Sequence, residues 1–451
     1  MKRSVLHKFP VFVQDIAISL YGYNLYRQRY GQEYKTHKQT LLQNQNKPLE
    51  VLKREQNEEL CRFIKYAQKH SSFYRELYAG INLNQITSVD DLGLLPVVDK
   101  EMLRANIENV YTISQKDSIA AFTGGTTGKA LQVRFTKEDF QKRMAYLDVF
   151  KLNLGVDPFK SKKATFSGRE LFERSDSNKI FWRNNWAYNQ RLYSTFDLTS
   201  KNIPLYIKDL NKFKPEIING FVSAIYEIAS FAEAGNLNFE FIPEAIFTTS
   251  ETLLPHHRSL IERVFGCRVY DQYASAEGAP FITECAHGQL HYCLDTGVIE
   301  TISTPAGNEM LITSFTTHGT PLIRYKIGDL IEFKNGDCKC GSKHPLVNKI
   351  EGRMVDSLES EKYGKISLSH LSDVIKGLPN CVKNVQFQQT AKNKIIVLLA
   401  VDEKQYNVST EQKIQEALCY RFGSETELVF KTVDSIPREK SGKHALIKNL
   451  I

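Results

Sequence analysis

The sequence has no hydrophobic run long enough to cross a membrane. Its most apolar N-terminal stretch is interrupted by Gln14 and Asp15, whereas a spanning helix needs about 20 consecutive apolar residues. The same stretch has no clean signal-peptide core and no cleavage site, so the expected location is the cytoplasm. These absences argue against an integral membrane protein and against a secreted one.

Cysteine is also sparse, at 8 in 451 residues, which argues against a disulfide-stabilised scaffold. No internal repeat or low-complexity segment is visible. The hydrophobic content of 42% and the charged content of 24% are typical of a globular protein. A chain of 451 residues is too long for one ordinary core, so we expect two or three folding units.

Net positive charge is nearly absent from the body of the chain and concentrated at its start. Residues 1–70 hold thirteen Lys and Arg against six Asp and Glu, and so carry seven of the eight net positive charges. This segment is also rich in tyrosine, which suits contact with an anionic membrane face or an acidic partner. A packed helical arm with a solvated basic face accounts for the same residues, and we expect that arrangement. We expect no nucleic-acid partner.

The stretch FTGGTTGKALQVRF, residues 122–135, lacks two residues that a P-loop requires. Thr123 stands where the first glycine belongs, and Ala130 replaces the Ser or Thr that follows the lysine. The alternation after the loop predicts a strand, and a helix begins only later, with Thr136 as N-cap and Asp139 three residues on. A loop of glycines and hydroxyls between strands still offers backbone N–H groups to an anion. We therefore predict an anion-binding loop outside the Walker type.

The apolar periodicity predicts an α/β architecture. Residues 1–115 are mostly helical in pattern, and residues 116–330 alternate β-type runs with helical ones. The last 95 or so residues form a small α+β unit. Examples in these two regions are strands at 246–250 and 268–275, a helix at 255–266, strands at 382–389, 394–401 and 427–431, and a helix at 410–422.

Five further stretches follow the glycine-rich loop in a fixed order. They are TTSET (248–252), YASAEG (273–278), RYKIGD (324–329), KIEGRMVD (349–356) and PREKSGK (437–443). In this order and spacing the chain resembles the adenylate-forming enzymes, the superfamily of acyl- and aryl-CoA ligases. It is similar in particular to the phenylacetate–CoA ligase branch, and within it to CapK-like proteins and deazaflavin-coenzyme synthetase relatives. The resemblance extends from about residue 10 to the end.

This resemblance implies a large N-terminal multi-layer α/β adenylation domain and a small mobile C-terminal α+β domain. Residues 1–115 would be a helical region packed on the body. Residues 116–355 would complete the large domain with the ATP site and a zinc-type Cys/His cluster. Residues 356–451 would be a lid domain that carries a catalytic lysine.

The resemblance also implies ATP-dependent, AMP-forming activation of a carboxylic acid. The carboxylate would attack the α-phosphorus of ATP, release pyrophosphate and leave an acyl-adenylate. The glycine-rich loop would surround the β- and γ-phosphates, with a lysine supplying positive charge nearby. The residues matched to this role are Thr123, Gly124, Gly125, Thr126, Thr127, Gly128 and Lys129.

Five residues match the family's nucleotide site. Glu277 would hold Mg²⁺, which commonly takes one carboxylate together with substrate phosphates. Tyr273 would lie beside the adenine and the substrate carboxyl, and Asp329 would accept both ribose hydroxyls with its two oxygens. Ser250 and Glu251 belong to the stretch that lines the adenine pocket.

Two residues match family positions at the domain junction and on the lid. Arg353 would lie near the ribose. Lys443 would bridge the substrate carboxylate and the α-phosphate, because a long cationic side chain on a mobile domain can enter for one step and leave for the next. The family's hinge aspartate stands two residues after the arginine, where this chain has Val355, and an acid follows at Asp356.

Four of the cysteines lie between residues 285 and 340. Cys285 and His291 form one short pair, and Cys338 and Cys340 form another about fifty residues later. Two such pairs are typical of a structural zinc site with four protein ligands and no open position for catalysis. His287 and Cys293 are the alternative ligands in these segments, and the branch named above has similar residues in these places.

The sequence is compatible with three functions. The favoured one is a ligase that transfers the activated acid to a thiol, either of coenzyme A or of a carrier protein, in surface-polysaccharide or secondary-metabolite synthesis. The second is an adenylyltransferase that leaves AMP on a hydroxyl. The third is a non-catalytic paralogue that serves as a scaffold, which the presence of Glu277, Asp329, Arg353 and Lys443 argues against.

Overall fold

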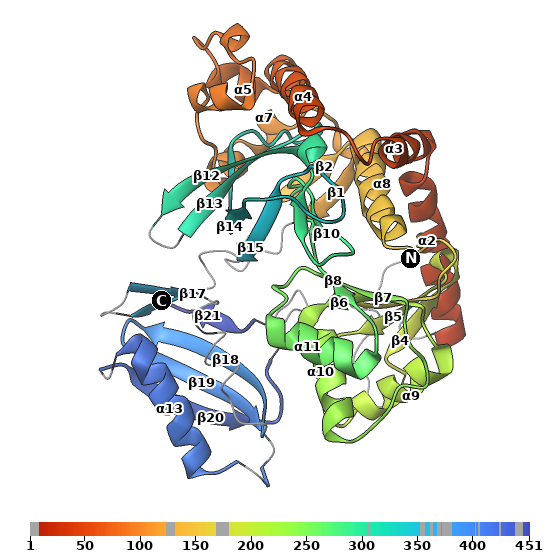
Figure 1. Cartoon of the computed structure of the whole chain (residues 1–451), viewed down its shortest axis with the longest axis vertical. Helices are drawn as coiled ribbons and strands as arrows, with labels where there is room; N and C mark the ends of the chain where they lie inside the picture. The colour runs from red at the N-terminus through yellow and green to blue at the C-terminus, as the bar shows by residue number, and fades with distance from the viewer. Residues whose placement is uncertain are drawn as a thin grey trace. The chain divides into compact units, whose positions relative to one another are not determined.

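The structure is a computed structural model of the chain (Figure 1). Its internal contacts divide the chain into two compact units. The first unit holds Met1–Ser19, Ser161–Val269 and Glu351–Ile451, and the second holds Leu20–Lys160 and Tyr270–Ile350. The structure describes residues 9–122, 131–167, 180–304, 307–351, 357–360, 364–367, 371, 381–401, 403–404, 406–423, 425–437 and 445–451.

The first unit contains a six-stranded sheet whose inner strands run parallel. The strand order is β4-β5-β3-β6-β7-β8, with β4 antiparallel to β5. Helices α9, α10 and α11 pack on this sheet through a shared apolar cluster. The bounds are β3 Lys163–Ser167, β4 Trp182–Asn185, β5 Gln190–Ser194, α9 Ile203–Phe213, β6 Ile217–Phe221, α10 Val222–Ala234, β7 Ala245–Thr249, α11 Pro255–Phe265 and β8 Val269–Tyr270.

The sequence accounts for these elements directly. The run AIFTT in β7 is almost wholly buried, as expected of a strand covered on both faces. Helix α11 begins with Pro255, whose missing N–H costs nothing in the first turn. It ends before Gly266, which takes the left-handed conformation with φ +70°. The predicted strand at 246–250 and helix at 255–266 are thus confirmed.

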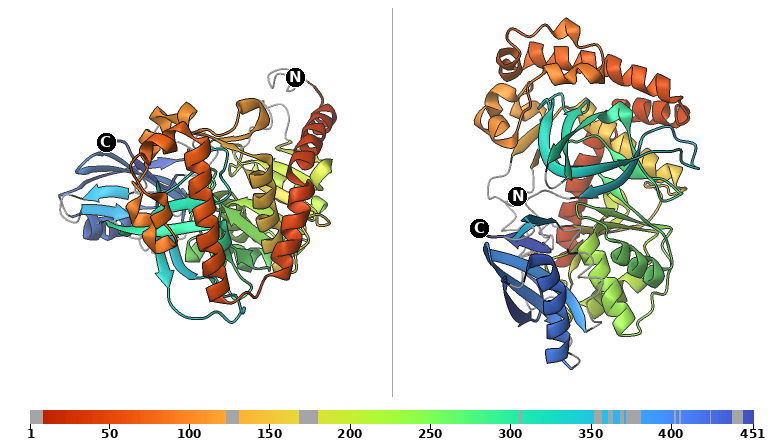
Figure 2. Two further views of the ribbon diagram at one scale, coloured as in Figure 1. Left: turned by 90° about the horizontal axis from the view of Figure 1, so that it is seen from above. Right: turned by 60° about the vertical axis from the view of Figure 1, so that its left-hand side comes forward.

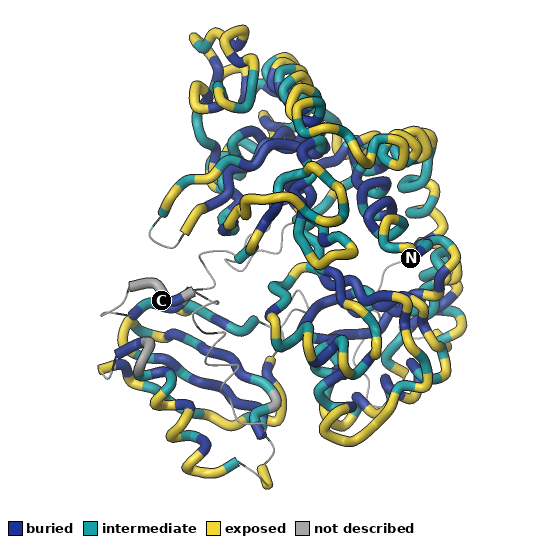
Figure 3. The backbone as a smooth tube through the Cα atoms, in the orientation of Figure 1, coloured by how far each residue is buried: buried dark blue, intermediate teal, exposed yellow. Residues whose placement is uncertain are grey.

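The C-terminal part of the first unit is a four-stranded sheet with the order β20-β19-β18-β21. Its inner strands β18 and β19 are largely buried, and helix α13 packs on them (Figure 3). This confirms the predicted strand pair, helix and final strand, and β18 and β19 pair antiparallel. The bounds are β16 Ser357–Ser360, β17 Gly364–Ser367, β18 Val382–Ala391, β19 Lys394–Val401, α13 Val408–Phe422, β20 Glu427–Val433 and β21 Ile447–Asn449.

The second unit is built on a seven-stranded sheet with the order β12-β13-β14-β15-β11-β10-β9. Helix α4 packs on this sheet, where Leu60 and Phe63 join the same apolar core as Ile312 and Tyr325 (Figure 2). The strand bounds are β9 Gln272–Tyr273, β10 Ile282–Glu284, β11 Leu290–Tyr292, β12 Gly297–Thr304, β13 Gly307–Ser314, β14 Tyr325–Lys334 and β15 Leu346–Glu351.

The N-terminal part of the described chain is helical, as predicted. Residues 50–79 carry apolar residues at helical spacing, and the structure divides this stretch into two helices at Ser71. The Ser71 side chain caps the second helix by accepting from the Tyr74 N–H. Asp99 likewise caps α6. The bounds are α2 Val11–Arg29, α3 Gln32–Gln43, α4 Leu49–His70, α5 Ser72–Leu77, α6 Lys100–Ala105 and α7 Ile107–Val110, with 3₁₀ helices Leu83–Gln85, Val89–Leu94 and Gln115–Asp117.

A short hairpin precedes helix α8 in the second unit. Strands β1 (Ile119–Phe122) and β2 (Gln132–Phe135) pair antiparallel, with Phe122 opposite Gln132. Helix α8 (Lys137–Asn153) starts at Thr136, whose Oγ1 accepts the Asp139 N–H at 3.0 Å. The glycine-rich segment therefore joins two strands, as predicted, and the helix begins only after the second strand.

The domain boundaries expected at residues 115 and 355 remain predictions. The two compact units come from internal contacts, and each combines segments from different parts of the chain.

Among the described helices, none has both the length and the apolar content that a membrane crossing needs.

Candidate active site and metal cluster

The residues matched to the triphosphate loop, Thr123–Lys129, lie outside the described residues. Their flanking strands are described, and the first and last pairs of the β1–β2 ladder join Ile119 to Phe135 and Phe122 to Gln132. A loop closed by an antiparallel pair differs from a P-loop, which runs from a strand directly into a helix. The assignment of these residues to phosphate binding stays a prediction.

Tyr273 and Asp329 are brought together in the second unit. The Tyr273 hydroxyl donates to Asp329 Oδ2 at 2.6 Å. Tyr273 ends β9 at one edge of the sheet, and Asp329 lies on β14, four strand positions away. In a flat sheet four spacings would place them about 19 Å apart, so the sheet must curl for this bond to form. The two residues that the motifs assigned to the nucleotide are therefore neighbours.

Asp329 follows a glycine of β14 whose backbone has a positive φ. Gly328 has φ +87°, a conformation that favours glycine. The Asp329 carboxylate has about four acceptor sites, so the bond from Tyr273 is compatible with a further donor pair. A diol such as the ribose hydroxyls would supply such a pair.

Glu277 is buried, with 4% of its surface exposed, at the end of the YASAEG turn. The next residue, Gly278, has φ +100°, and a Cβ there would lie 2.5 Å from the Thr317 side chain. The turn is closed by the Gly278 N–H, which donates to the Ser275 carbonyl at 3.1 Å, and by the Ala279 N–H, which donates to Ser275 Oγ at 3.0 Å. This backbone fixes the position of the predicted Mg²⁺ ligand.

Arg143, on helix α8, holds the same turn and was missed by the motif analysis. Its Nη1 donates to the carbonyls of Gly278 and Ala279 at 3.0 and 3.2 Å and to Thr316 Oγ1 at 2.8 Å. Burial lowers the pKa of Arg143 to about 10, and the Asp139 carboxylate partly offsets that effect. One weak signal is present in the sequence, a charged residue on the face of the helix that is buried in the structure.

Ser250 and Glu251 follow strand β7 in the first unit. Ser250 has φ +68°, which is uncommon for a residue other than glycine and marks local strain. The Glu251 carboxylate accepts from the Ser223 N–H at 2.7 Å and from Ser223 Oγ at 3.0 Å. It thereby satisfies a backbone donor in the first turn of α10. Glu251 thus has a structural role that the sequence did not indicate, in addition to its predicted place by the adenine.

Arg353 and Lys443 lie outside the described residues, and so do Val355 and Asp356. Their predicted roles at the ribose, at the α-phosphate and at the hinge are carried forward as proposals.

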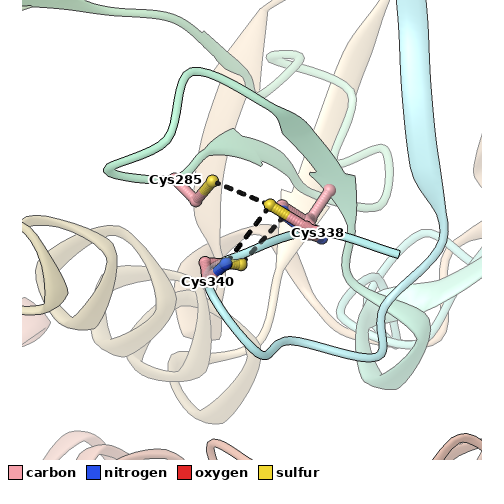
Figure 4. A group of neighbouring side chains, drawn as sticks. Cys285, Cys338 and Cys340 are labelled. Carbon is pink, nitrogen blue, oxygen red and sulfur yellow. Dashed lines mark hydrogen bonds between the residues drawn. The ribbon is translucent and has the colours of Figure 1, made fainter. Parts of the chain in front are cut away.

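Cys285, His291, Cys338 and Cys340 converge in the second unit. Figure 4 shows the three cysteines of this group. Their four ligand atoms all lie within 4.8 Å of one another. Cys285 Sγ is 3.6 Å from Cys338 Sγ, and Cys340 Sγ is 3.3 Å from His291 Nε2. A tetrahedral zinc site with Zn–S bonds of about 2.3 Å has S···S edges of about 3.8 Å, so the donor set fits such an ion.

The strand order explains why pairs fifty residues apart meet. Strands β10 and β11 form a hairpin, with Thr283 opposite His291, and its turn carries Cys285. Strand β15 pairs with the other side of β11, with Leu346 opposite His291. The segment that leads into β15 carries Cys338 and Cys340, so the sheet delivers both pairs to one end of β11. His287 and Cys293, the alternative ligands, are not members of this cluster.

His291 is oriented by a second contact. Its Nδ1 lies 3.1 Å from the His344 carbonyl oxygen, which can only accept, so Nδ1 carries the proton. The Nε2 lone pair is then directed at the cluster, an arrangement typical of metal-binding histidines. Burial lowers the pKa of His291 and raises that of the Cys340 thiol to about 12.

A cavity of about 770 Å³ borders the cluster within the second unit. Cys285, His291 and Cys340 line it, together with residues of α3, α4 and α8. The cluster is therefore reachable by a small chelator from this side.

Comparison with known proteins gives matches over the whole chain. Residues 358–450 match the family model of the CapK C-terminal domain. The chain is 34% identical to protein CapK of Staphylococcus aureus, with 100% of both chains covered. It is 24% identical to phenylacetate–coenzyme A ligase of Thermus thermophilus, over 69% of this chain and 72% of that relative.

A solved structure shows the same fold. The crystal structure of 2-hydroxyisobutyryl-CoA ligase in the postadenylation state, in complex with R3-HIB-AMP, matches with a TM-score of 0.69 and 17% identity. The match covers 90% of this chain and 91% of that chain. The predicted fold class, a large α/β adenylation domain with a small C-terminal domain, is confirmed.

Proposed function

The chain belongs to the CapK family of the adenylate-forming superfamily, and from that premise we propose that it activates a carboxylic acid with ATP and passes it to a thiol. In the first step a carboxylate oxygen bonds to the α-phosphorus of ATP, and the bond to pyrophosphate breaks. In the second step a thiolate bonds to the acyl carbon, and AMP leaves. The acceptor is coenzyme A or the thiol of a carrier protein.

Some residues of this chain would bind the nucleotide, and others would neutralise its negative charge. Asp329 would accept the ribose hydroxyls, and Tyr273 would orient that carboxylate. Glu277 would hold Mg²⁺, which neutralises phosphate charge when it is bound. Residues Thr123–Lys129 would bind the outer phosphates, and Lys443 and Arg353 would bring positive charge to the reacting phosphate and the ribose.

The contact between Tyr273 and Asp329 is the observation that best supports this proposal. The two residues come from different motifs and are 56 positions apart in the sequence, yet the Tyr273 hydroxyl lies 2.6 Å from Asp329 Oδ2. Glu277 follows in the same YASAEG segment as Tyr273 and is held by the buried Arg143 network. A scaffold protein has no physical need for this combination of a buried acid, a glycine-enforced turn and an oriented carboxylate.

An assay of pyrophosphate release tests the proposal. Purified protein is incubated with ATP, Mg²⁺ and a panel of aryl, aliphatic and sugar-linked acids, with and without coenzyme A. Acid-dependent pyrophosphate release, followed by thioester formation, is the expected result. Stable attachment of AMP to a hydroxyl would show an adenylyltransferase instead. Absence of turnover across the panel, together with absence of ATP binding, would contradict the proposal.

We also propose that Cys285, His291, Cys338 and Cys340 hold a structural zinc ion. Four protein ligands close a tetrahedral site and leave no position for substrate. The ion would join the β10–β11 turn to the segment before β15 and would contribute to folding stability. Metal analysis of protein purified without added metal would be expected to find about one zinc per chain.

A further inference from the structure

The cavity of about 770 Å³ lies wholly within the second unit, and helices α3, α4 and α8 supply much of its wall. Helices α3 and α8 lie side by side (Figure 1). The Tyr34 N–H of α3 donates to Gln141 Oε1 at 3.2 Å, and the Tyr34 hydroxyl donates to Asp148 Oδ2 at 3.1 Å. These buried bonds join the two helices, so two walls of the cavity are fixed by specific contacts.

The size and the lining of this cavity suit a small organic molecule. Its volume of about 770 Å³ is far above the roughly 30 Å³ of one water and is within the range of about 300–1,000 Å³ that is typical of ligand sites. None of Tyr273, Glu277 and Asp329 lines it, so it is separate from the candidate nucleotide site. Large apolar or aromatic side chains form part of the wall, namely Leu52, Tyr146, Val149, Phe150, Phe281 and Phe315.

Two polar atoms of the lining are buried and lack a hydrogen-bond partner among the described residues. They are His37 Nε2 and Asp295 Oδ1. Burial lowers the pKa of His37 to about 4, and the Asp295 carboxylate partly offsets that effect, so the imidazole is neutral near neutral pH. Leaving a buried polar atom unpaired costs free energy. A molecule that brings a hydrogen-bond donor to this end of the cavity would therefore be stabilised.

The charges of the lining leave one cation and one anion without an ionic partner. In the part of the chain that the structure describes, no ion pair involves Lys142 or Asp295. Both charges act on His37, because the Asp295 carboxylate raises its pKa and Lys142 lowers it. The other charged side chains are engaged: Lys47 with Glu55 at 2.7 Å, Arg62 with Glu59 at 2.7 Å, Glu58 with Arg54 at 3.8 Å, and Glu284 with the Asp271 N–H at 2.7 Å.

We propose that this cavity binds a free α-amino acid with an apolar side chain. The ammonium group donates to Asp295 Oδ1, the carboxylate pairs with Lys142, and the side chain packs against the aromatic wall. His37 Nε2 can accept from the same ammonium group. A ligand with one charge would leave either Lys142 or Asp295 uncompensated, which is costly where water is partly excluded. This inference does not rest on the proposed function.

Calorimetric titration of the full chain, without ATP, tests the proposal. The probes are L-phenylalanine and L-leucine, together with phenethylamine and hydrocinnamate, which keep the phenyl ring and carry only the cation or only the anion. We expect saturable binding of at least one amino acid with a Kd of about 1 mM or lower. The two ligands with one charge are expected to bind at least about tenfold more weakly than L-phenylalanine.

Substitutions in the cavity separate this site from the candidate nucleotide site. Lys142→Met and Asp295→Asn are each expected to weaken amino-acid binding at least about tenfold. Lys137→Met, at an exposed lysine of the same helix as Lys142, should leave binding unchanged. Thermal melting of each variant checks that the fold is retained, and Lys142→Met keeps the test open if Asp295→Asn does not fold.

Three results would overturn the proposal. The first is absence of saturable binding of both amino acids. The second is binding of phenethylamine or hydrocinnamate as tight as that of L-phenylalanine. The third is equal amino-acid binding by wild type and Lys142→Met protein. Acid-dependent pyrophosphate release by a protein that binds neither amino acid would contradict this inference and leave the proposed function intact.

Discussion

Two groups of residues lie on the seven-stranded sheet of the second unit. One is recognised as a functional site only through family motifs, and the other through the chemistry of its side chains. Tyr273 and Asp329 meet across the curl of the sheet, and nothing in their chemistry alone marks a nucleotide site. The Cys285–His291–Cys338–Cys340 cluster needs no family motif, because three thiols and an imidazole with ligand atoms within 4.8 Å of one another could hold a metal ion on their chemistry alone. The comparison suggests two separable roles, chemistry for the first group and stability for the second.

The largest effect is expected from Lys443→Ala. Removing a positive charge from the developing transition state costs about 10²–10³-fold in rate in comparable cases. We expect adenylation to fall by that factor, with ATP affinity and melting temperature nearly unchanged. Single-turnover adenylate formation and ATP titration measure the two quantities, with Lys443→Arg as the matched control. Equal loss of rate and ATP affinity would contradict the assigned role.

Asp329→Asn should weaken ATP binding without unfolding the protein. Each hydrogen bond to a charged group contributes about 1.5–3 kcal/mol, so a rise of about 10–100-fold in the KM for ATP is expected. Asp90→Asn, at an exposed acid of the same unit, is the control. A large fall in melting temperature, with KM unchanged in the folded fraction, would place Asp329 in the structural group instead.

Cys338→Ser should lower the stability of the protein and leave adenylation nearly unchanged, which is the opposite of the result expected for Asp329→Asn. We expect loss of about one bound zinc per chain and a melting temperature lower by about 5 °C or more, with adenylation by the folded protein within about twofold of wild type. Cys419→Ser, at a free cysteine outside the cluster, should change neither quantity. Unchanged metal content in Cys338→Ser protein would remove the zinc proposal.

Tyr273→Phe is expected to have the smallest effect. It deletes the hydroxyl that donates to Asp329 and keeps the ring, so the loss is about 1 kcal/mol, or roughly fivefold in the KM for ATP. Tyr21→Phe, at an exposed tyrosine, serves as the control. A hundredfold loss would mean that Tyr273 does more than orient the carboxylate.

Local signals in the sequence predicted the elements that depend on neighbouring residues. The N-cap at Thr136, the strand pair at 382–401 and the proline-led helix at 255–266 all follow from short-range rules, and all three are present. Ligand type and spacing also predict the four cluster residues, and the structure brings them together.

The contacts that depend on tertiary packing could not be predicted. Arg143 reaches the carbonyls of Gly278 and Ala279 over more than 130 positions, and no pattern near residue 143 indicates those partners. Glu251 caps α10 through Ser223 because β6, which leads directly into α10, pairs with β7, which Glu251 follows. The sequence predicts a packed helical arm at the start of the chain, and it could not show that Phe12 and Leu20 of α2 are exposed, because the periodicity of a helix does not say which face is inward.

The closeness of Cys285 and Cys338 has a practical consequence for handling the protein. Their sulfur atoms are 3.6 Å apart, and a disulfide needs about 2.05 Å, so a small movement of one loop would allow oxidation once the thiols were no longer held by an ion. Chelator treatment in air would then trap a cross-linked form that added zinc does not restore. We expect preparations kept under reductant to retain their free thiols, which a thiol titration before each assay would show.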